Sequence, residues 1–305
     1  MSVINQNYPN LEYIIIDGGS SDETVSIIRK YEKFISYWVS EPDRGQSHAI
    51  NKGLGKCTGE IFNWLNSDDW YMPGALFEVA NAFINNSAAQ FVSGYENLVE
   101  LNGMVNLHTG TFLKPSIEET IEFCEVSQPS TFFKLDAIRK VNGVSEDLHY
   151  IMDGEMWVKL LLLYGQDHFV KIKTVLVNFR LHAGSKTVSN TIVNNFWIER
   201  SNIILNLQRS ILLPGKIAHF FRETVYHSPK LMRLERNWTF NDRVISPRKL
   251  RIYYIKKYML KLFLAGERKE AAWAVKQLIL NRSFDFVLLK SIVKLIFKGQ
   301  STWKP

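Results

Sequence analysis

Residues 61–70 end an apolar stretch with two adjacent carboxylates, Asp68 and Asp69. Neighbouring like charges repel and are expensive to hold at the end of a buried strand. A hard divalent cation bound by carboxylate oxygens removes that cost and keeps coordination positions open for phosphate oxygens. The pattern therefore indicates a metal–diphosphate site at a strand end. A solvated Asp-Asp turn that caps a helix starting near Pro73 explains it equally well.

The segment before Asp17 has the form of a second strand end. A β-branched run at residues 13–16 leads into Asp17, two glycines and helix-capping residues. The pattern predicts a strand, a tight loop and a helix over residues 24–33. This arrangement places ligands at the carboxyl end of a parallel sheet.

A third polar loop carries Asp43 and Arg44 and opens a short helix, which we expect to end at Gly53. A helix N-terminus with an arginine beside it suits a phosphate group. Three successive strand ends thus carry groups that are compatible with phosphate.

With these loops in place, the chain resembles the family 2 glycosyltransferases, which have the GT-A fold. The resemblance covers roughly residues 2–188. The matching blocks keep the family's order: residues 5–10, 16–22, 41–45, 49–53, 58–60, 65–69, 128–133 and 150–157. It implies an α/β fold, with a Rossmann-like, mainly parallel sheet flanked by helices, and a nucleotide-sugar as donor.

The resemblance also implies a donor-binding set. Asp17 would contact the base or ribose, and Asp43 and Arg44 would line the nucleotide and diphosphate pocket. The whole set comprises Asp17, Gly18, Asp43, Arg44, Asn51, Asn66, Ser67 and Asp69.

Residues 66–68 occupy the place of the family's DxD motif. The resemblance implies that Asp68 binds a divalent cation, Mg²⁺ or Mn²⁺, that bridges the donor's diphosphate. Asn66 replaces the first acid, so fewer formal charges remain and we expect weaker metal binding. His182 follows a predicted strand and would ligate the metal or touch the phosphate. An ordinary exposed loop explains His182 equally well.

Asp153 precedes an apolar helical run at residues 155–163. The resemblance implies that it deprotonates the acceptor hydroxyl, with Glu155 as second choice. An inverting transfer needs one general base opposite the leaving diphosphate, and a carboxylate can serve. The alternative is that Asp153 is a helix N-cap and Glu155 a first-turn acid favoured by the helix dipole.

Family members carry a strand and a helix ahead of the segment matched by residues 5–10. This chain starts at Met1, in what would be the tail of that helix. We therefore expect a central parallel strand to be missing, which leaves its neighbours with unpaired backbone groups and removes half of the nucleotide pocket. Either the true start lies upstream, or the chain is a shortened family member.

Composition and patterning divide the chain into a GT-A domain over residues 1–190 and a helical, basic extension over residues 191–305. A hydrophobic content of 46% supports a sizeable core. Residues 90–100 and 104–109 predict a hairpin around Asn102-Gly103. Cys57 and Cys124 show no metal or disulfide spacing, and no signal peptide is visible. We expect a cytoplasmic protein.

The basic extension carries the net charge. Residues 241–305 hold fifteen Lys or Arg against four Asp or Glu, a balance of +11, interleaved with apolar and aromatic residues. This pattern suits a helix lying on anionic lipid, at the inner face of the cell membrane. A helical bundle with a basic solvated face fits equally well. No nucleic-acid motif accompanies the charge, so nucleic acid is not an expected partner.

The residues and the resemblance together predict an inverting glycosyltransferase. It would move a sugar from a nucleotide-diphosphate donor to a saccharide or lipid-linked acceptor hydroxyl, in bacterial surface polysaccharide or glycolipid synthesis. The alternative is a truncated, non-catalytic homologue that binds a partner or a membrane. A sugar nucleotidyltransferase would require a Gly-rich basic loop after the first strand, a region that is missing here.

Overall fold

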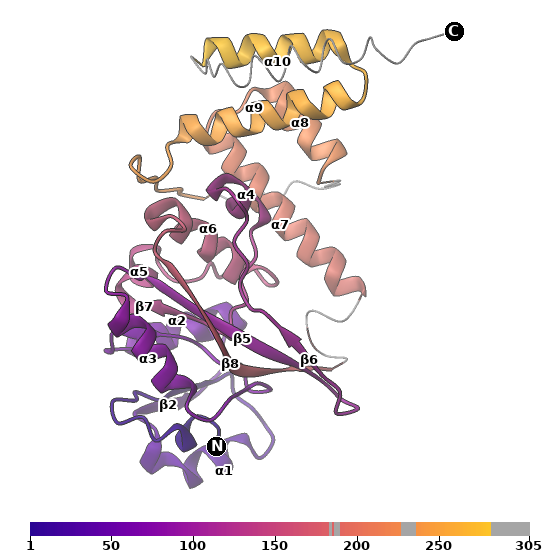
Figure 1. Cartoon of the computed structure of the whole chain (residues 1–305). Coiled ribbons are helices and arrows are strands. Elements are labelled where there is room, and N and C mark those ends of the chain that lie inside the picture. Colours follow the sequence, from indigo (N-terminus) through magenta and orange to yellow (C-terminus); the bar gives the residue numbers. More distant parts are fainter. Residues whose placement is uncertain (183–184, 186–189, 227–235, 282–305) are drawn as a thin grey trace. The chain divides into compact units, whose positions relative to one another are not determined.

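The structure is a computed structural model that describes residues 1–182, 185, 190–226 and 236–281 (Figure 1). Two compact units form the chain. The first comprises residues 1–204 and 228–245, and the second residues 205–227 and 246–305. The predicted boundary at residue 190 coincides with the start of α7 (Asn190–Ser210), whereas the units divide within that helix, after Ile204.

The first unit contains two sheets. In the smaller sheet, β1 (Ile14–Asp17) pairs with β2 (Tyr37–Ser40) in parallel. The larger sheet has the order β3-β7-β5-β8-β4, with β6 added to β5. Its strands are β3 (Ile61–Phe62), β4 (Trp70–Tyr71), β5 (Phe91–Glu100), β6 (Val105–His108), β7 (Thr131–Lys134) and β8 (Phe169–Leu181). The central β5–β8 pair is parallel and its flanking pairs are antiparallel.

The two sheets are not joined by strand pairing within the described residues. There β1 pairs with β2 alone, and β3 pairs with β7 alone. The backbone groups on the other edge of each strand therefore have no strand partner in that part of the chain.

Helices cover the sheets, and their apolar faces follow helical spacing. The helices of this unit before α7 are α1 (Thr24–Lys30), α2 (Gln46–Lys56), α3 (Ala75–Asn85), α4 (Ile117–Phe123), α5 (Leu135–Lys140) and α6 (Met152–Tyr164). In α3 the buried residues Ala75, Val79, Ala82 and Phe83 lie on one face, as an amphipathic helix requires.

Two predicted helix boundaries were wrong. The helix expected over residues 24–33 ends at Lys30, and a short 3₁₀ turn (Glu32–Phe34) follows it. The helix expected to end at Gly53 continues to Lys56. Gly53 does not adopt the left-handed conformation that closes a helix at a glycine, so the helix passes through it.

Helix α6 is the most deeply buried element near the site. Met156, Trp157, Leu160 and Leu161 are fully inaccessible. The Trp157 ring packs edge-on against Phe91 of β5, with 5.1 Å between ring centroids. This packing fixes the helix on the sheet, and with it the first turn that carries Asp153.

The hairpin predicted at residues 90–109 is confirmed as β5 and β6, with Gly103 at a φ of 85° in the turn. Both cysteines are free, as expected. These local signals were reliable because each depends on a few adjacent residues.

The second unit is helical. It contains the end of α7, α8 (Gly215–Thr224), α9 (Pro247–Leu264) and α10 (Arg268–Leu280). Residues 211–214 separate α7 from α8, and residues 265–267 separate α9 from α10. Among the described helices, none has the length and apolar character needed to cross a membrane.

Aromatic side chains of the second unit pack against one another. Tyr258 of α9 contacts Phe220 of α8 and Trp273 of α10, and Tyr254 contacts Phe221. Tyr254 and Tyr258 are thus buried in a bundle over residues 215–224 and 247–280. Leu260, Leu264, Ile279 and Leu280 stay exposed on these helices beside the basic residues.

Candidate active site

A large cavity in the first unit brings together half of the predicted site residues. Asp68, Asp69, Asp153 and His182 all line it, although they lie up to 114 positions apart in sequence. Asn66 and Ser67 line it as well. The cavity therefore joins the DxD-like segment to the predicted base.

Asp68 and His182 meet directly. The Nε2 atom of His182 lies 2.8 Å from Oδ2 of Asp68, and both side chains are about one-third exposed. Asp68 follows β3 and His182 follows β8, so the sheet holds both. Most of the loop expected after His182 lies outside the described residues.

This pair fits a divalent cation. Carboxylate oxygen and imidazole nitrogen are both accepted ligands of Mn²⁺, and Mg²⁺ favours the carboxylate. No group of three or more His, Cys, Asp or Glu suited to a metal occurs in the described part of the chain. A site with one or two protein ligands leaves positions for phosphate oxygens, as is usual for cations that bind with a diphosphate.

Asp69 is a buried carboxylate that holds the turn next to Asp68. Its carboxylate is 6% exposed and accepts hydrogen bonds from the backbone N–H of Arg180 (3.0 Å) and from Asn66 Nδ2 (3.3 Å). Burial raises the pKa of Asp69 to about 6, and the charges of Asp68 and Glu96 act in the same direction. Asp69 thus ties the DxD-like turn to the end of β8.

Asn66 is held from both sides. Its amide oxygen accepts a hydrogen bond from Gln46 Nε2 at 2.8 Å, and its amide nitrogen donates to Asp69. Because Gln46 is the first residue of α2, the substitution of Asn for the first acid links this turn to that helix. Neighbouring Ser67 is exposed on the cavity wall.

The predicted nucleotide-binding residues before residue 60 lie outside the lining of this cavity. None of Asp17, Gly18, Asp43, Arg44 and Asn51 is among the residues that line this cavity in the described structure. The two strand-end loops are nevertheless in contact, because a Cβ at Gly18 would lie 2.6 Å from Oδ2 of Asp43. Asp43 also accepts the backbone N–H of Gly45 at 2.7 Å, at the start of α2.

Asp17 organises its own loop. Its carboxylate accepts hydrogen bonds from the Ser20 hydroxyl and backbone, the Ser40 hydroxyl and the Gly19 backbone. The Ser20 and Ser40 hydroxyls contribute most to holding the pKa of Asp17 down at about 2. Asp17 therefore stays ionised and fixes the turn between β1 and α1.

Arg44 and Asn51 hold a loop instead of facing the cavity. Arg44 Nη2 pairs with Glu146 Oε2 at 2.6 Å. Asn51 donates to the carbonyl of Val144 at 2.8 Å and accepts the Val144 N–H at 3.1 Å. These polar atoms are engaged by residues 144–146, a segment far away in sequence, and the donor-binding role of Arg44 and Asn51 stays a prediction.

Asp153 lies in the first turn of α6 and lines the cavity. It was expected to precede the helix, but α6 already begins at Met152. The residue after it must be small, because a Cβ at Gly154 would lie 2.4 Å from the carbonyl oxygen of Cys124. The helix thereby approaches that backbone closely and holds Asp153 at the cavity.

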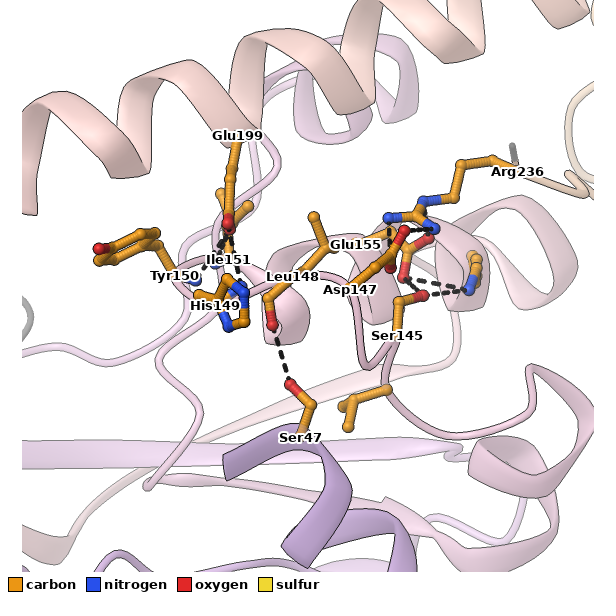
Figure 2. Close-up of polar contacts among 12 residues, drawn as sticks. Ser47, Ser145, Asp147, Leu148, His149, Tyr150, Ile151, Glu155, Glu199 and Arg236 are labelled. Atoms are coloured by element: carbon orange, nitrogen blue, oxygen red, sulfur yellow. Dashed lines mark hydrogen bonds and ion pairs between the residues drawn. The ribbon is translucent and has the colours of Figure 1, made fainter. Parts of the chain in front are cut away.

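Glu155 is the predicted site residue that the structure does not support. Its side chain is fully buried, away from the cavity lining. One carboxylate oxygen lies 2.8 Å from Arg236 Nε, and the other accepts from Ser145 Oγ and lies 3.1 Å from Lys159 Nζ (Figure 2). A carboxylate held in this way has no access to an acceptor, so Glu155 is structural.

Glu199 is a residue that sequence reasoning missed. Its carboxylate, on α7, accepts the backbone N–H groups of His149 (3.0 Å), Tyr150 (2.8 Å) and Ile151 (3.1 Å) (Figure 2). These donors precede α6, where helix geometry leaves N–H groups without partners. Glu199 lies beyond every matched block, and no local signal marked it.

The loop at residues 144–151 is also held by other groups. Ser47 Oγ donates to the Leu148 carbonyl at 3.0 Å, and Arg236 makes a two-pronged pair with Asp147 at 3.0 and 2.9 Å (Figure 2). This loop leads directly into α6. Because several elements hold this loop in place, they also set the position of Asp153.

Replacement of Glu199 by Gln should reduce stability by about 1–3 kcal/mol, since one of the two acceptor oxygens is replaced by a donor that faces buried N–H groups. Urea unfolding followed by circular dichroism measures this. The matched control is Glu60→Gln, because the Glu60 side chain is 90% exposed; its effect should stay below about 0.5 kcal/mol. Equal effects of the two substitutions would contradict the role of Glu199.

Residues 1–132 match the family described as Glycosyl transferase family 2. Relatives include an uncharacterized glycosyltransferase of Rickettsia typhi, 29% identical over 258 residues, which are 74% of this chain and 75% of that protein. One of Rickettsia bellii is 29% identical over 248 residues, 74% of this chain but 35% of that protein. One of Mycobacterium tuberculosis is 28% identical over 185 residues, 58% of this chain and 67% of that protein.

Solved structures with a similar fold include S. aureus TarS 1–349. Its complex with UDP gives a TM-score of 0.53 at 14% identity, and its complex with UDP-GlcNAc gives 0.51 at 15% identity. Each comparison covers 99% of this chain and 87% of the other. At such identity the likeness shows the fold, which is that of the GT-A glycosyltransferases. Residues 1–132 thus match glycosyl transferase family 2, the named relatives are glycosyltransferases, and the fold is that of the GT-A enzymes.

Proposed function

We propose that this chain is an inverting, divalent-cation-dependent glycosyltransferase that moves a sugar from a nucleotide-diphosphate donor to an acceptor hydroxyl. The observation that carries the proposal is the single cavity that holds Asp68, His182 and Asp153. It combines a pair of cation ligands with a separate carboxylate on a rigid helix. An inverting transfer requires these two groups and no covalent intermediate.

In the proposed reaction, the Asp153 carboxylate takes the proton from the acceptor hydroxyl. The hydroxyl oxygen then attacks the anomeric carbon of the donor, and the bond from that carbon to the diphosphate oxygen breaks. The proton remains on Asp153 until solvent takes it. Asp68 and His182 would hold the cation, which when bound stabilises the charge that develops on the leaving diphosphate.

A UDP-sugar is the first donor to test, because TarS was solved with UDP and with UDP-GlcNAc. The proposed setting is bacterial surface polysaccharide or glycolipid synthesis at the cytoplasmic face of the cell membrane. The +11 balance of residues 241–305 supports this setting, because basic segments are attracted to anionic lipid. A saccharide or lipid-linked acceptor would be met there.

A non-catalytic binding homologue is the second candidate. One observation favours it: five predicted donor-binding residues, Asp17, Gly18, Asp43, Arg44 and Asn51, are absent from the cavity lining described above. A chain of this kind would bind a sugar or a nucleotide without turnover. Turnover assays separate the two candidates.

Hydrolysis of a panel of UDP-, GDP- and dTDP-sugars with Mn²⁺ or Mg²⁺ tests the proposed function. We expect release of nucleotide that requires the cation, and a loss of about 100-fold or more in Asp68→Ala, because a metal ligand is removed. Asp167→Ala is the control, since Asp167 is exposed and lies away from the cavity. Turnover by none of the donors, while the protein is folded, supports the non-catalytic candidate.

The membrane proposal predicts that the chain floats with anionic vesicles and not with neutral ones. Lys261, Lys269 and Lys276 are exposed on the second unit. Their joint replacement by Gln should weaken binding by about 100-fold, because each basic residue near an anionic surface contributes about 1 kcal/mol and about 1.4 kcal/mol corresponds to a factor of ten. Equal flotation of the parent and the triple variant, or equal binding to neutral vesicles, would contradict an electrostatic attachment.

A further inference from the structure

Glu96 and His108 form a pair that none of the roles above uses. They lie opposite each other in the β5–β6 hairpin. The Glu96 side chain is 7% exposed, and its Oε1 atom lies 2.8 Å from His108 Nδ1. Both residues line the cavity that holds Asp68 and Asp153. The pair is therefore part of the wall of the proposed active site.

The second oxygen of Glu96 is unusual. Oε2 is buried and has no hydrogen-bond partner among the described residues. Buried polar atoms in native proteins are nearly always hydrogen-bonded, and exceptions call for an explanation. Because Glu96 lines the cavity, a hydrogen-bond donor located there would supply the missing bond.

The charges near Glu96 indicate which chemical group could donate a hydrogen bond to its Oε2 atom. Asp68 and Asp69 make this side of the cavity anionic, and the charge of Glu96 itself contributes to the raised pKa of Asp69. Without a bridging cation, an anion such as a phosphate is disfavoured beside these carboxylates. The hydrogen bond between His108 and Glu96 Oε1 raises the pKa of His108 above its usual range, and it leaves Glu96 Oε2 as the carboxylate atom without a described partner.

The neighbouring wall is apolar. Leu98 of β5 and Phe179 of β8 pair in register and both line the cavity. Leu98 lies two residues from Glu96 and thus on the same face of the strand. An acceptor oxygen beside an apolar and aromatic surface suits a sugar ring, which has hydroxyl donors at its edge and C–H groups on its face.

We propose that Glu96, oriented by His108, accepts a hydrogen bond from a sugar hydroxyl in the cavity and so helps to select the sugar. The hydroxyl belongs either to the donor sugar or to the acceptor sugar. The inference rests on the proposed function for its biological meaning. Glu96 is a binding residue and His108 is a positioning residue.

The test compares the parent with Glu96→Gln, and with Glu100→Gln as the control. Glu100 lies on the same strand but does not line the cavity. If the donor sugar is bound, Glu96→Gln weakens UDP-GlcNAc binding about tenfold in calorimetry, by loss of a charge-assisted hydrogen bond, and leaves UDP binding unchanged. If the acceptor sugar is bound, both affinities stay constant, and saturation-transfer NMR signals of methyl glycosides added with UDP decrease.

A second readout reports on the pair itself. NMR titration should show that the pKa of His108 falls in Glu96→Gln and stays constant in Glu100→Gln. If the parent turns over no nucleotide-sugar, the proposed function fails; sugar signals that are present in the parent and lost in Glu96→Gln would still support the subsite. Unchanged UDP-GlcNAc and glycoside binding in Glu96→Gln, an unchanged His108 pKa, or no sugar binding by the parent overturns the inference.

Discussion

Replacement of Asp153 by Asn is expected to lower the rate of sugar transfer about 100- to 10,000-fold, the range usual for loss of a positioned general base. The amide has nearly the same shape as the carboxylate but cannot take the acceptor proton. Steady-state assays with the preferred donor measure this effect. Donor affinity should change little, because Asp153 acts on the acceptor.

Asp136 provides a matched control for this substitution. It is the second residue of α5, as Asp153 is the second residue of α6, and it is exposed. If Asp153 only favoured the helix dipole, both Asn variants would lose about 0.3–1 kcal/mol of stability and retain activity. Equal activity of the two variants would therefore refute the assignment of the base.

Removal of the Glu155 carboxylate is expected to destabilise the first unit by about 3–5 kcal/mol. Glu155→Ala takes the buried carboxylate away from both Arg236 and Lys159 and, among the described residues, leaves Arg236 paired with Asp147 alone. The side chains of Glu155 and Arg236 are 0% and 7% exposed. A buried charge that loses its partner is strongly destabilising. Thermal and urea unfolding of Glu155→Ala measure the loss.

A double variant separates the cost of an Arg236 charge left without Glu155 from the cost of losing the Glu155 side chain. Glu155→Met combined with Arg236→Met removes both charges, and replacement of a buried ion pair by apolar residues is often neutral or stabilising. We therefore expect the double variant to be more stable than Glu155→Ala. If Glu155→Ala costs less than about 1 kcal/mol, the ion pair is not the main support of this region.

The sequence contained enough information to separate Asp153 from Glu155. Residues two apart on an α-helix point about 200° away from each other, since each residue turns the helix by about 100°. When one of them faces a cavity, the other faces the opposite side. The order of matched blocks led to Asp153, and the apolar residues around Glu155 indicated a core that would require a partner for its charge.

Contacts over long sequence separations could not be predicted. Arg44 and Asn51 lie in a loop and helix whose form suits phosphate, yet they bind residues 144–146, which are brought to them only by the fold. Glu199 reaches the loop before α6 from a helix with no motif. Such roles follow from which elements become neighbours, and local spacing does not determine that.

The basic extension shows a different limit of sequence patterning. Apolar and basic residues at helical spacing are equally typical of an interfacial helix and of a bundle. Tyr254 and Tyr258 are buried against α8 and α10, so these two side chains pack within a bundle. The basic residues on the outer face of these helices are available to contact anionic lipid.

The most direct measurement of the central claim is ¹H NMR of the anomeric proton during cation-dependent turnover of an α-linked nucleotide-sugar. An inverting, cation-dependent transfer produces the β-anomer first, and we expect its rate of formation to fall about 100-fold or more in both Asp68→Ala and Asp153→Asn. A first product with retained α-configuration, or turnover that neither substitution affects, would contradict that claim.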